Sequence, residues 1–331
     1  MTRASVLAGP CLLVVATALL GSIVSSATGV YFITALVSVA IVVALYVFIG
    51  NSGVVSFGHI SFVALGVWTA GVLSVPRAQK QAIMPGLAGF LTHTTVGNVP
   101  SLLLAALVGG VAAALVGLPL MRLSGLAAGI ATFAVLEITH NLLRYYEKIG
   151  PGLNTFSSVP ETTGIRQAAI GALLVIVAAF LYARSRYGRM LRATREDPAA
   201  AAATGVSIYR QRLVAFALSG AIAGFAGGLY IHLLPLNTEG VYLDLTFITL
   251  AMLVIGGATS LWGAVVGALA VSALDSFLAE AENGIKILGG TLDLPSGTRV
   301  IAEGALMALV LIFRPGGLTG GREFVLRWRR K

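Results

Sequence analysis

The sequence predicts an all-α polytopic membrane protein with about ten transmembrane helices. Of its 331 residues, 57% are hydrophobic and 11% are charged, whereas an ordinary soluble domain carries about 25% charged residues. The apolar residues gather in runs near the length that a helix needs to cross the hydrocarbon layer, about 20 residues. A soluble fold is excluded because so few charged side chains could not cover its surface.

Ten apolar runs, cut at charges, prolines and polar clusters, are the predicted spans. They cover residues 4–25, 30–49, 54–75, 101–120, 125–143, 167–183, 213–233, 243–255, 264–278 and 300–313. The eighth and ninth are short and interrupted by glycine. For the first run the alternative is a cleaved signal peptide, because Arg3 precedes it and small residues follow it.

The basic residues favour one orientation of these spans. The chain has 22 lysines and arginines against 13 acidic residues, a net charge of +9. With the N-terminus inside, alternation leaves seven basic residues outside and the other fifteen inside, in line with the cytoplasmic bias of Lys and Arg. We therefore expect one transmembrane domain over residues 1–331, with both termini, a loop at 184–212 and a basic tail at 314–331 in the cytoplasm. Charges confined to such short segments do not predict nucleic-acid binding.

Three glycines of the seventh span, Gly220, Gly224 and Gly228, are spaced by four residues and share one helix face. Small residues in this pattern let a neighbouring backbone approach closely within lipid. We expect tight packing inside the bundle, and the alternative is a face toward a pore or another subunit.

Two segments rich in glycine and hydroxyl groups, residues 50–59 and 256–263, interrupt the apolar helices. Irregular backbone at membrane depth persists only where protein buries it or where it lines an aqueous cavity, and such breaks point to substrate paths. His59 is either a titrating gate or a structural histidine held by hydrogen bonds. The pathway candidates from the two breaks are Asn51, Ser56, His59, Ser260 and Trp262.

The fifth span carries four polar side chains on one helix face, Glu137, His140, Asn141 and Arg144. Ionisable groups that face lipid cost about 2.5 to 3.5 kcal/mol on insertion scales, so this stripe should face the bundle or a cavity. Glu137 is therefore a further pathway candidate. The alternative is a structural network near the outer interface, where Arg144 can extend its charge to water.

No motif for catalysis, nucleotide binding or a metal centre passes a spacing test. No lysine follows a glycine anywhere in the chain, which excludes a P-loop. Cys11 is the only cysteine, and the four histidines do not form an H-E-x-x-H motif, so neither a metalloenzyme site nor a disulfide is expected. We expect no enzyme activity and no cofactor; if ATP drives this protein, partner subunits bind it.

The loop at 184–212 contains a predicted short helix. Asp197 can cap its N-terminus, Pro198 suits the first helical position, a run of alanines continues it and Gly205 ends it. Such a helix is either an interfacial filler or the element that a permease inserts into a cleft of a partner ATPase.

A series of short segments, in order along almost the whole chain, carries a resemblance to a known family. They are residues 52–59, 123–125, 131–133 with Glu137, 187–189, 195–197 to Gly205, 215–216, 224–228 to Tyr230, 254–257, 260–263 and 313–318. In these segments the chain resembles the LivM-type permease subunit of branched-chain amino acid ABC importers, in the LivH/LivM family.

The resemblance implies a type II-like importer permease in the plasma (inner) membrane of a bacterium, surrounded by membrane lipid. It implies a second, LivH-like permease, two cytosolic ATPases and an extracytoplasmic binding protein that delivers branched-chain or related amino acids. The family's coupling helix maps onto Arg195, Glu196, Asp197 and Gly205.

Other functions remain as alternatives. Permeases of the same family carry urea, amides or aromatic acids. A self-sufficient ion-coupled carrier would use Glu137 and Asp275 as its proton or sodium residues. A membrane enzyme would need a nucleophile, a base and an orienting group together, and the sequence does not group them.

Overall fold

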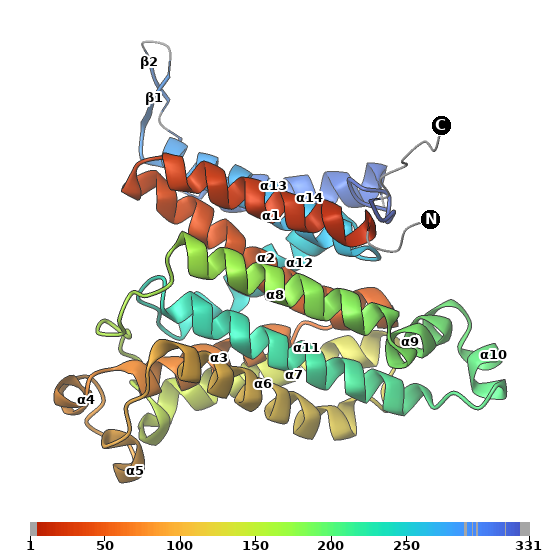
Figure 1. Cartoon of the computed structure of the whole chain (residues 1–331), viewed down its shortest axis with the longest axis horizontal. Coiled ribbons are helices and arrows are strands. Elements are labelled where there is room, and N and C mark those ends of the chain that lie inside the picture. The colour runs from red at the N-terminus through yellow and green to blue at the C-terminus, as the bar shows by residue number, and fades with distance from the viewer. Residues whose placement is uncertain (1–4, 288–289, 293, 296, 315, 325–331) are drawn as a thin grey trace.

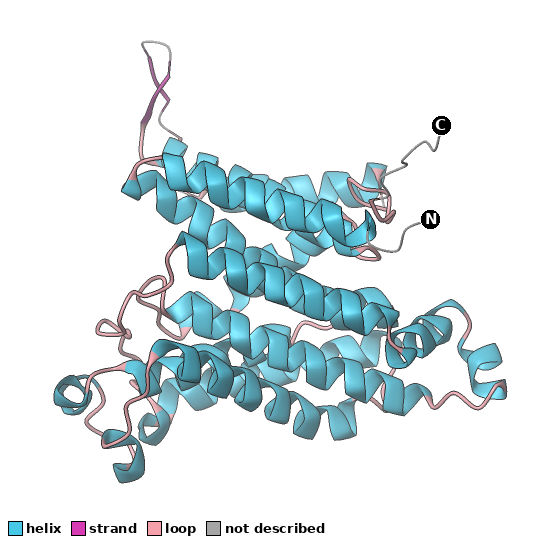
Figure 2. Ribbon diagram, in the orientation of Figure 1, coloured by secondary structure: helices cyan, strands magenta, loops and turns pink. Residues whose placement is uncertain are grey.

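The computed structural model describes the chain except residues 1–4, 288–289, 293, 296, 315 and 325–331. The described residues are almost entirely helical (Figures 1 and 2). The α-helices are α1 (Ser5–Ile23), α2 (Ser26–Ser52), α3 (His59–Ser74), α4 (Arg77–Ile83), α5 (Gly89–Thr92), α6 (Asn98–Leu120), α7 (Gly125–Tyr145), α8 (Ile165–Arg184), α9 (Arg186–Glu196), α10 (Pro198–Ala203), α11 (Ile208–Ile231), α12 (Leu243–Gly256), α13 (Leu261–Glu282) and α14 (Thr298–Phe313). Two short 3-10 helices are η1 (Glu147–Ile149) and η2 (Glu239–Val241), and β1 (Ile285–Ile287) pairs antiparallel with β2 (Gly290–Leu292).

Each of the ten predicted spans corresponds to one of these helices, and the polytopic helical class is confirmed. In the part of the chain that the structure describes, eight helical segments are long and apolar enough to cross a membrane, one of them formed by η2 running into α12. The remaining two, α3 and α14, have 16 residues each. The small β1–β2 hairpin is the departure from an all-α chain within the described residues.

Most predicted limits shift by a few residues, and two of the predicted spans are corrected in kind. The third begins at His59 rather than at residue 54, because residues 53–58 leave the helix. The ninth is not short, since α13 has 22 residues. Its glycines lie inside the helix and serve packing, since they let α12 approach closely: an ideal Cβ on Gly267 would lie 2.0 Å from Met252 O.

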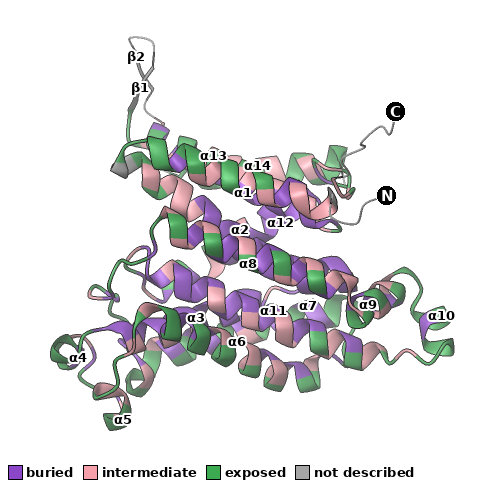
Figure 3. Cartoon of the chain, in the orientation of Figure 1, coloured by how far each residue is buried: buried purple, intermediate pink, exposed green. Residues whose placement is uncertain are grey.

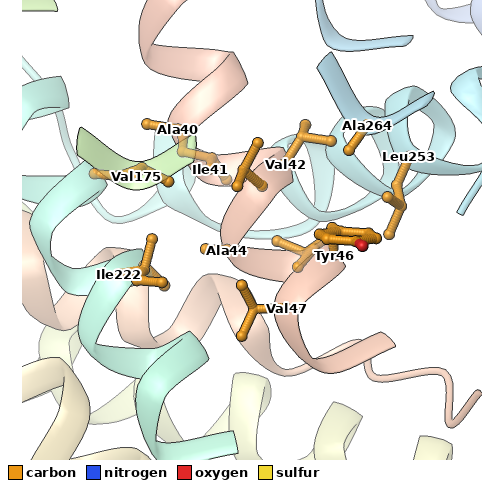
Figure 4. Packing of buried hydrophobic residues seen from close by; sticks show 14 of the residues in the cluster. Ala40, Ile41, Val42, Ala44, Tyr46, Val47, Val175, Ile222, Leu253 and Ala264 are labelled. Atoms are coloured by element: carbon orange, nitrogen blue, oxygen red, sulfur yellow. The ribbon is translucent and has the colours of Figure 1, made fainter. Parts of the chain in front are cut away.

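Helix α2 forms the centre of the bundle. Almost every side chain from Leu36 to Phe48 is buried, as expected of a helix that is apolar on all sides. Figure 4 shows its side chains meeting those of four other helices, and Figure 3 shows that buried residues gather on the inner helices of the bundle. The labelled partners are Val175 of α8, Ile222 of α11, Leu253 of α12 and Ala264 of α13.

The predicted glycine stripe of α11 lies against α6. An ideal Cβ would lie 2.2 Å from Ala113 Cβ at Gly220, and 2.3 Å from Ala105 O at Gly224. At Gly228 it would lie 2.8 Å from Leu102 Cδ2. The two backbones can approach this closely only because these positions have no side chain.

The two ends of the bundle differ. One end carries α4, α5 and the β1–β2 hairpin, and the other carries α9 and α10 (Figure 1). At the first end Lys80 is buried and donates to Leu91 O at 2.9 Å and to Thr94 O. Burial, with a smaller contribution from Arg77, lowers the pKa of Lys80.

Candidate pathway and coupling sites

The first break comprises residues 53–58, between α2 and α3. It begins with Gly53 at φ 71°, the left-handed conformation that commonly ends a helix. Its far end lies against α7. Phe57 N–H donates to Thr132 Oγ1 at 3.1 Å, and an ideal Cβ on Gly58 would lie 2.3 Å from Thr132 O. The end of the break next to α3 is therefore packed against α7.

The three candidates near this break, Asn51, Ser56 and His59, are each 1% exposed. Ser56 Oγ and His59 Nδ1 share a hydrogen bond of 2.8 Å. Ring centroids 5.0 to 6.1 Å apart link His59, Phe48, Phe62 and Phe216. His59 is thus hydrogen-bonded at one ring nitrogen and enclosed by aromatic side chains.

The second break comprises residues 257–260, between α12 and α13. Ser260 is fully buried and caps α13, where its Oγ accepts a backbone N–H at 2.9 Å. The carboxylate of Glu323 accepts the first two N–H groups of α13, from Leu261 at 2.8 Å and from Trp262 at 3.2 Å. A carboxylate at a helix N-terminus is favourable. Burial raises the pKa of Glu323, and these N–H donors oppose that shift.

Residues 316–324 cover the second break. Leu318 N–H donates to Ile255 O at 2.7 Å, which satisfies a carbonyl at the end of α12. The half-buried ring of Trp262 lies 4.9 Å, centroid to centroid, from that of Phe324. The sequence motifs contain the break, but they do not reveal that a segment some 60 positions later closes it.

The end of α2, just before the first break, touches the second break. An ideal Cβ on Gly50 would lie 2.5 Å from Ala258 O. Both breaks adjoin elements at the end of the bundle that carries α9, because Arg195 of α9 donates to Gly50 O at 2.6 Å. The structure thus brings five sequence candidates into one region, with Asn51 and Ser260 tied to neighbouring segments.

Glu137 lies on the exposed side of α7. Its carboxylate accepts from Asn141 Nδ2 at 2.7 Å and from Tyr242 Oη. The ring of His140 stacks on that of Tyr242, with centroids 3.8 Å apart and 15° between planes. The sequence predicts the three α7 residues together but not Tyr242, which approaches from the start of α12.

The network continues toward the α4–α5 end through η2. Arg144 Nη1 lies 2.6 Å from Glu239 Oε1, and His140 Nε2 lies 3.7 Å from the same oxygen. His140 is 7% exposed, so it connects the exposed carboxylate of Glu137 to the interior. Glu239 has no sequence signal beyond its place in a loop between two spans.

The surroundings of Glu137 on α7 are apolar and exposed. Leu126 is 79% exposed, Ile130 is 62% exposed and Ile138 is 66% exposed. Because an ionised group facing lipid is unfavourable, this face suits a water-filled path or another protein better than lipid.

The loop between α8 and α11 folds as two helices. In α9 the buried side chains are Leu191 and Thr194, and Ser185 Oγ caps its start by accepting Gly188 N–H at 3.2 Å. Arg192 Nη1 donates to Asn51 Oδ1 at 3.0 Å. Helix α9 is thereby held against the end of α2.

Helix α10 is the predicted short helix and projects from the bundle (Figure 1). Asp197 Oδ1 accepts the N–H groups of Ala199 and Ala200, both at 2.9 Å, and Pro198 occupies the first position. Gly205 follows at φ 82° with open space around it. Most of α10 is exposed, so it can meet a partner without unfolding.

Within the described residues, no three side chains of His, Cys, Asp or Glu come together to hold a metal ion. Asp275 pairs with Arg299, whose Nε lies 3.1 Å from Asp275 Oδ1.

Comparison with known proteins places this helical chain in a family. The family described as "Branched-chain amino acid transport system / permease component" matches residues 26–313. The chain belongs to this family of transport permeases. It is therefore a multi-pass membrane protein of the branched-chain amino acid permease family.

Several curated relatives carry permease names. The "High-affinity branched-chain amino acid transport system permease protein LivM" is 27% identical in Salmonella typhimurium and 26% in Escherichia coli, over 83% of this chain and 65% of each relative. The chain thus spans just under two thirds of the length of these two relatives. A "Probable branched-chain amino acid transport permease protein LivM" of Methanocaldococcus jannaschii is 26% identical over 81% of this chain and 86% of its own.

A relative with a different transport name also matches. The "Autoinducer 2 import system permease protein LsrC" of Shigella flexneri is 31% identical over 47% of this chain and 44% of its own. No solved structure matches the chain significantly.

Proposed function

We propose that this chain is the transmembrane permease subunit of an ATP-driven ABC importer for branched-chain or related amino acids. Family membership over residues 26–313 carries the proposal. The chain works in a bacterial plasma membrane with both termini in the cytoplasm, beside a second, LivH-like permease. Two cytosolic ATPases supply the energy, and an extracytoplasmic binding protein delivers the substrate.

Helix α10 is the proposed contact with the ATPases. It projects at the end of the bundle where both breaks lie, and its ends are fixed by the Asp197 cap and by Gly205. In this orientation the α9–α10 end faces the cytoplasm, and the end with α4, α5 and the hairpin faces the binding protein. Residues 184–212 then form the coupling loop.

The exposed face of α7 around Glu137 is the proposed wall of the substrate path. A hydrogen-bonded carboxylate with an adjacent tyrosine ring suits a small polar solute. Asn51, Ser56, His59, Ser260 and Trp262 are proposed to change their surroundings when the breaks rearrange during alternating access.

Two other functions are distinguished by the test below. Urea, amides or aromatic acids are alternative cargoes, because sequence family alone does not select the solute. An ion-coupled carrier needs no ATPase. The exposed Glu137 is the observation in its favour, whereas Asp275 is paired with Arg299.

The test is co-purification followed by transport. The tagged chain is extracted gently from its native membrane, and its partners are identified by mass spectrometry. ATPases and a second permease should co-purify. Replacing residues 198–204 by a glycine–serine segment of equal length should release the ATPases, while the same replacement of residues 89–92 in α5 should not.

Reconstituted complexes then report the function. Uptake of radiolabelled leucine, urea or benzoate into proteoliposomes is measured with and without ATP and the binding protein. A chain that purifies alone and transports alone would contradict the proposal. ATP-dependent uptake of urea or benzoate, with none of leucine, would replace the proposed cargo and leave the importer intact.

A further inference from the structure

We propose that Arg192 and Arg195 of α9 are positioning residues that transmit the movement of the cytoplasmic loop to the two breaks. The inference rests on the proposed function, in which α10 receives the movement of the ATPases. It concerns how that movement reaches the membrane spans.

Arg195 binds the last turn of α2. Its Nη1 donates to Gly50 O at 2.6 Å, so it satisfies a carbonyl near a helix C-terminus with a positive charge. Its aliphatic part lies over Gly53, where an ideal Cβ would be 2.7 Å from Arg195 Cγ. Together with the left-handed backbone of Gly53, this contact fixes the point at which α2 turns into the first break.

Arg192 holds two spans at once. Its Nη1 donates to Asn51 Oδ1 at 3.0 Å, and its Nη2 donates to Ala183 O at 2.7 Å, in the last turn of α8. Asn51 Nδ2 in turn donates to Val47 O at 3.0 Å, which orients the amide for the guanidinium. A displacement of α9 therefore acts on the ends of α2 and α8 together.

Arg195 is also connected to the start of α10. Its Nε and Nη2 donate to Glu196 Oε1 at 3.1 and 2.6 Å. Glu196 precedes Asp197, the residue that caps α10. The guanidinium thus lies between the start of α10 and the end of α2.

The contact continues into the second break. Gly50, whose carbonyl Arg195 holds, is in backbone contact with Ala258, since an ideal Cβ on Gly50 would lie 2.5 Å from Ala258 O. Movement of the end of α2 therefore cannot leave the second break unaffected. The path runs from α10 through Arg195 to α2 and on to the break between α12 and α13.

Arg189 of the same helix provides a matched comparison. It is exposed, and its Nη1 donates to Arg184 O at 3.2 Å, within the loop itself. It carries the same charge on the same helix without reaching α2 in the described contacts. Replacing it changes the charge of α9 but leaves the contact with the breaks intact.

The experiment measures coupling in the complete reconstituted importer. Substrate uptake and ATP hydrolysis are determined in the same proteoliposomes, with the binding protein present, for Arg192→Ala, Arg195→Ala and Arg189→Ala. We expect the first two to retain the ATPases and to hydrolyse ATP while uptake per ATP falls at least about fivefold. Arg189→Ala should keep the wild-type ratio, and Arg195→Lys, which retains one donor for Gly50 O, should recover part of it.

A second variant on α2 separates coupling from folding of α9. Asn51→Ala removes one of the two partners of Arg192 without altering the loop. If the two residues act as one connection, Asn51→Ala should lower uptake per ATP, and the double variant should lower it no further than Arg192→Ala alone, because coupled residues are not additive. A thermal unfolding scan of each purified complex shows whether the variants are folded.

Three results would overturn the inference. An unchanged ratio of uptake to ATP hydrolysis in Arg195→Ala and Asn51→Ala would mean that these contacts only stabilise the packing of α9 against α2. Loss of the ATPases from folded variants would make the arginines part of the binding surface. Equal losses in Arg189→Ala would attribute the effect to charge alone. Failure of the wild-type complex to form would instead contradict the proposed function itself.

Discussion

Gly224 lies where α11 meets α6, and no side chain fits there, since an ideal Cβ would be 2.3 Å from Ala105 O. Gly224→Val should force the helices apart and lower the free energy of unfolding by about 1 to 3 kcal/mol, as overpacking does. Gly304→Ala in α14 is the control, because a Cβ there meets open space. Thermal unfolding in detergent compares them; equal midpoints for wild type and Gly224→Val would contradict the close packing.

Lys80 offers a test by pH outside the membrane spans. Burial lowers its pKa below the ordinary value of 10.5, so the folded state releases the proton first as pH rises. The contribution of Lys80 to stability should therefore increase with pH over the range from its lowered folded-state pKa up to the ordinary value of 10.5. Relative to Lys80→Met, the wild-type unfolding midpoint should shift upward over this range. A constant difference would show that Lys80 is as solvated in the folded protein as in the unfolded chain.

At the scale of elements, α10 depends on how it ends. Gly205 has φ 82°, a conformation that asparagine tolerates and that β-branched residues do not. Gly205→Val should displace α10 and reduce the amount of ATPase that co-purifies severalfold, whereas Gly205→Asn should retain most of it. Equal retention in both variants would mean that the ATPases do not depend on the geometry of α10.

The exposed carboxylate of α7 separates the two transport mechanisms. In an ATP-driven importer Glu137→Gln should keep uptake within about threefold of wild type, because the amide oxygen can still accept from Tyr242. An ion-coupled carrier would lose its ion-driven uptake. Uptake driven by ATP and by an ion gradient is compared for this variant and for Glu147→Gln, which lies in η1 outside the spans.

Across the whole molecule, composition and run length were enough to predict the ten apolar helices, because a helix in lipid needs an apolar surface over most of its length; the polar or short helices α4, α5 and α9 were not predicted. The positions of the breaks were also visible, since glycine and hydroxyl groups interrupt the apolar runs. Their partners were not. Glu323 caps α13 and Tyr242 binds Glu137 across 62 and 105 positions of sequence, and no periodicity within one span encodes such a pair.

The cytoplasmic loop shows the same difference between local signals and distant contacts. The Asp197 cap and Gly205 are local signals, so α10 was predictable from them. The hydrogen bonds of Arg192 and Arg195 to α2 join residues that are separated by 141 and 145 positions of sequence, so no local signal predicts them. In the sequence these arginines are two of several basic residues whose bias sets membrane orientation.

The closure of the second break by residues 318–323 also has a consequence for biosynthesis. The ribosome makes this segment after α12 and α13. During insertion, the carbonyl of Ile255 and the N–H of Leu261 therefore lack the hydrogen-bond partners that this segment later supplies. A chain stopped after residue 314 should insert its helices yet expose residues 257–260 to added protease, whereas one stopped after residue 324 should protect them. We therefore expect bundle assembly to be completed only after translation has passed the final span.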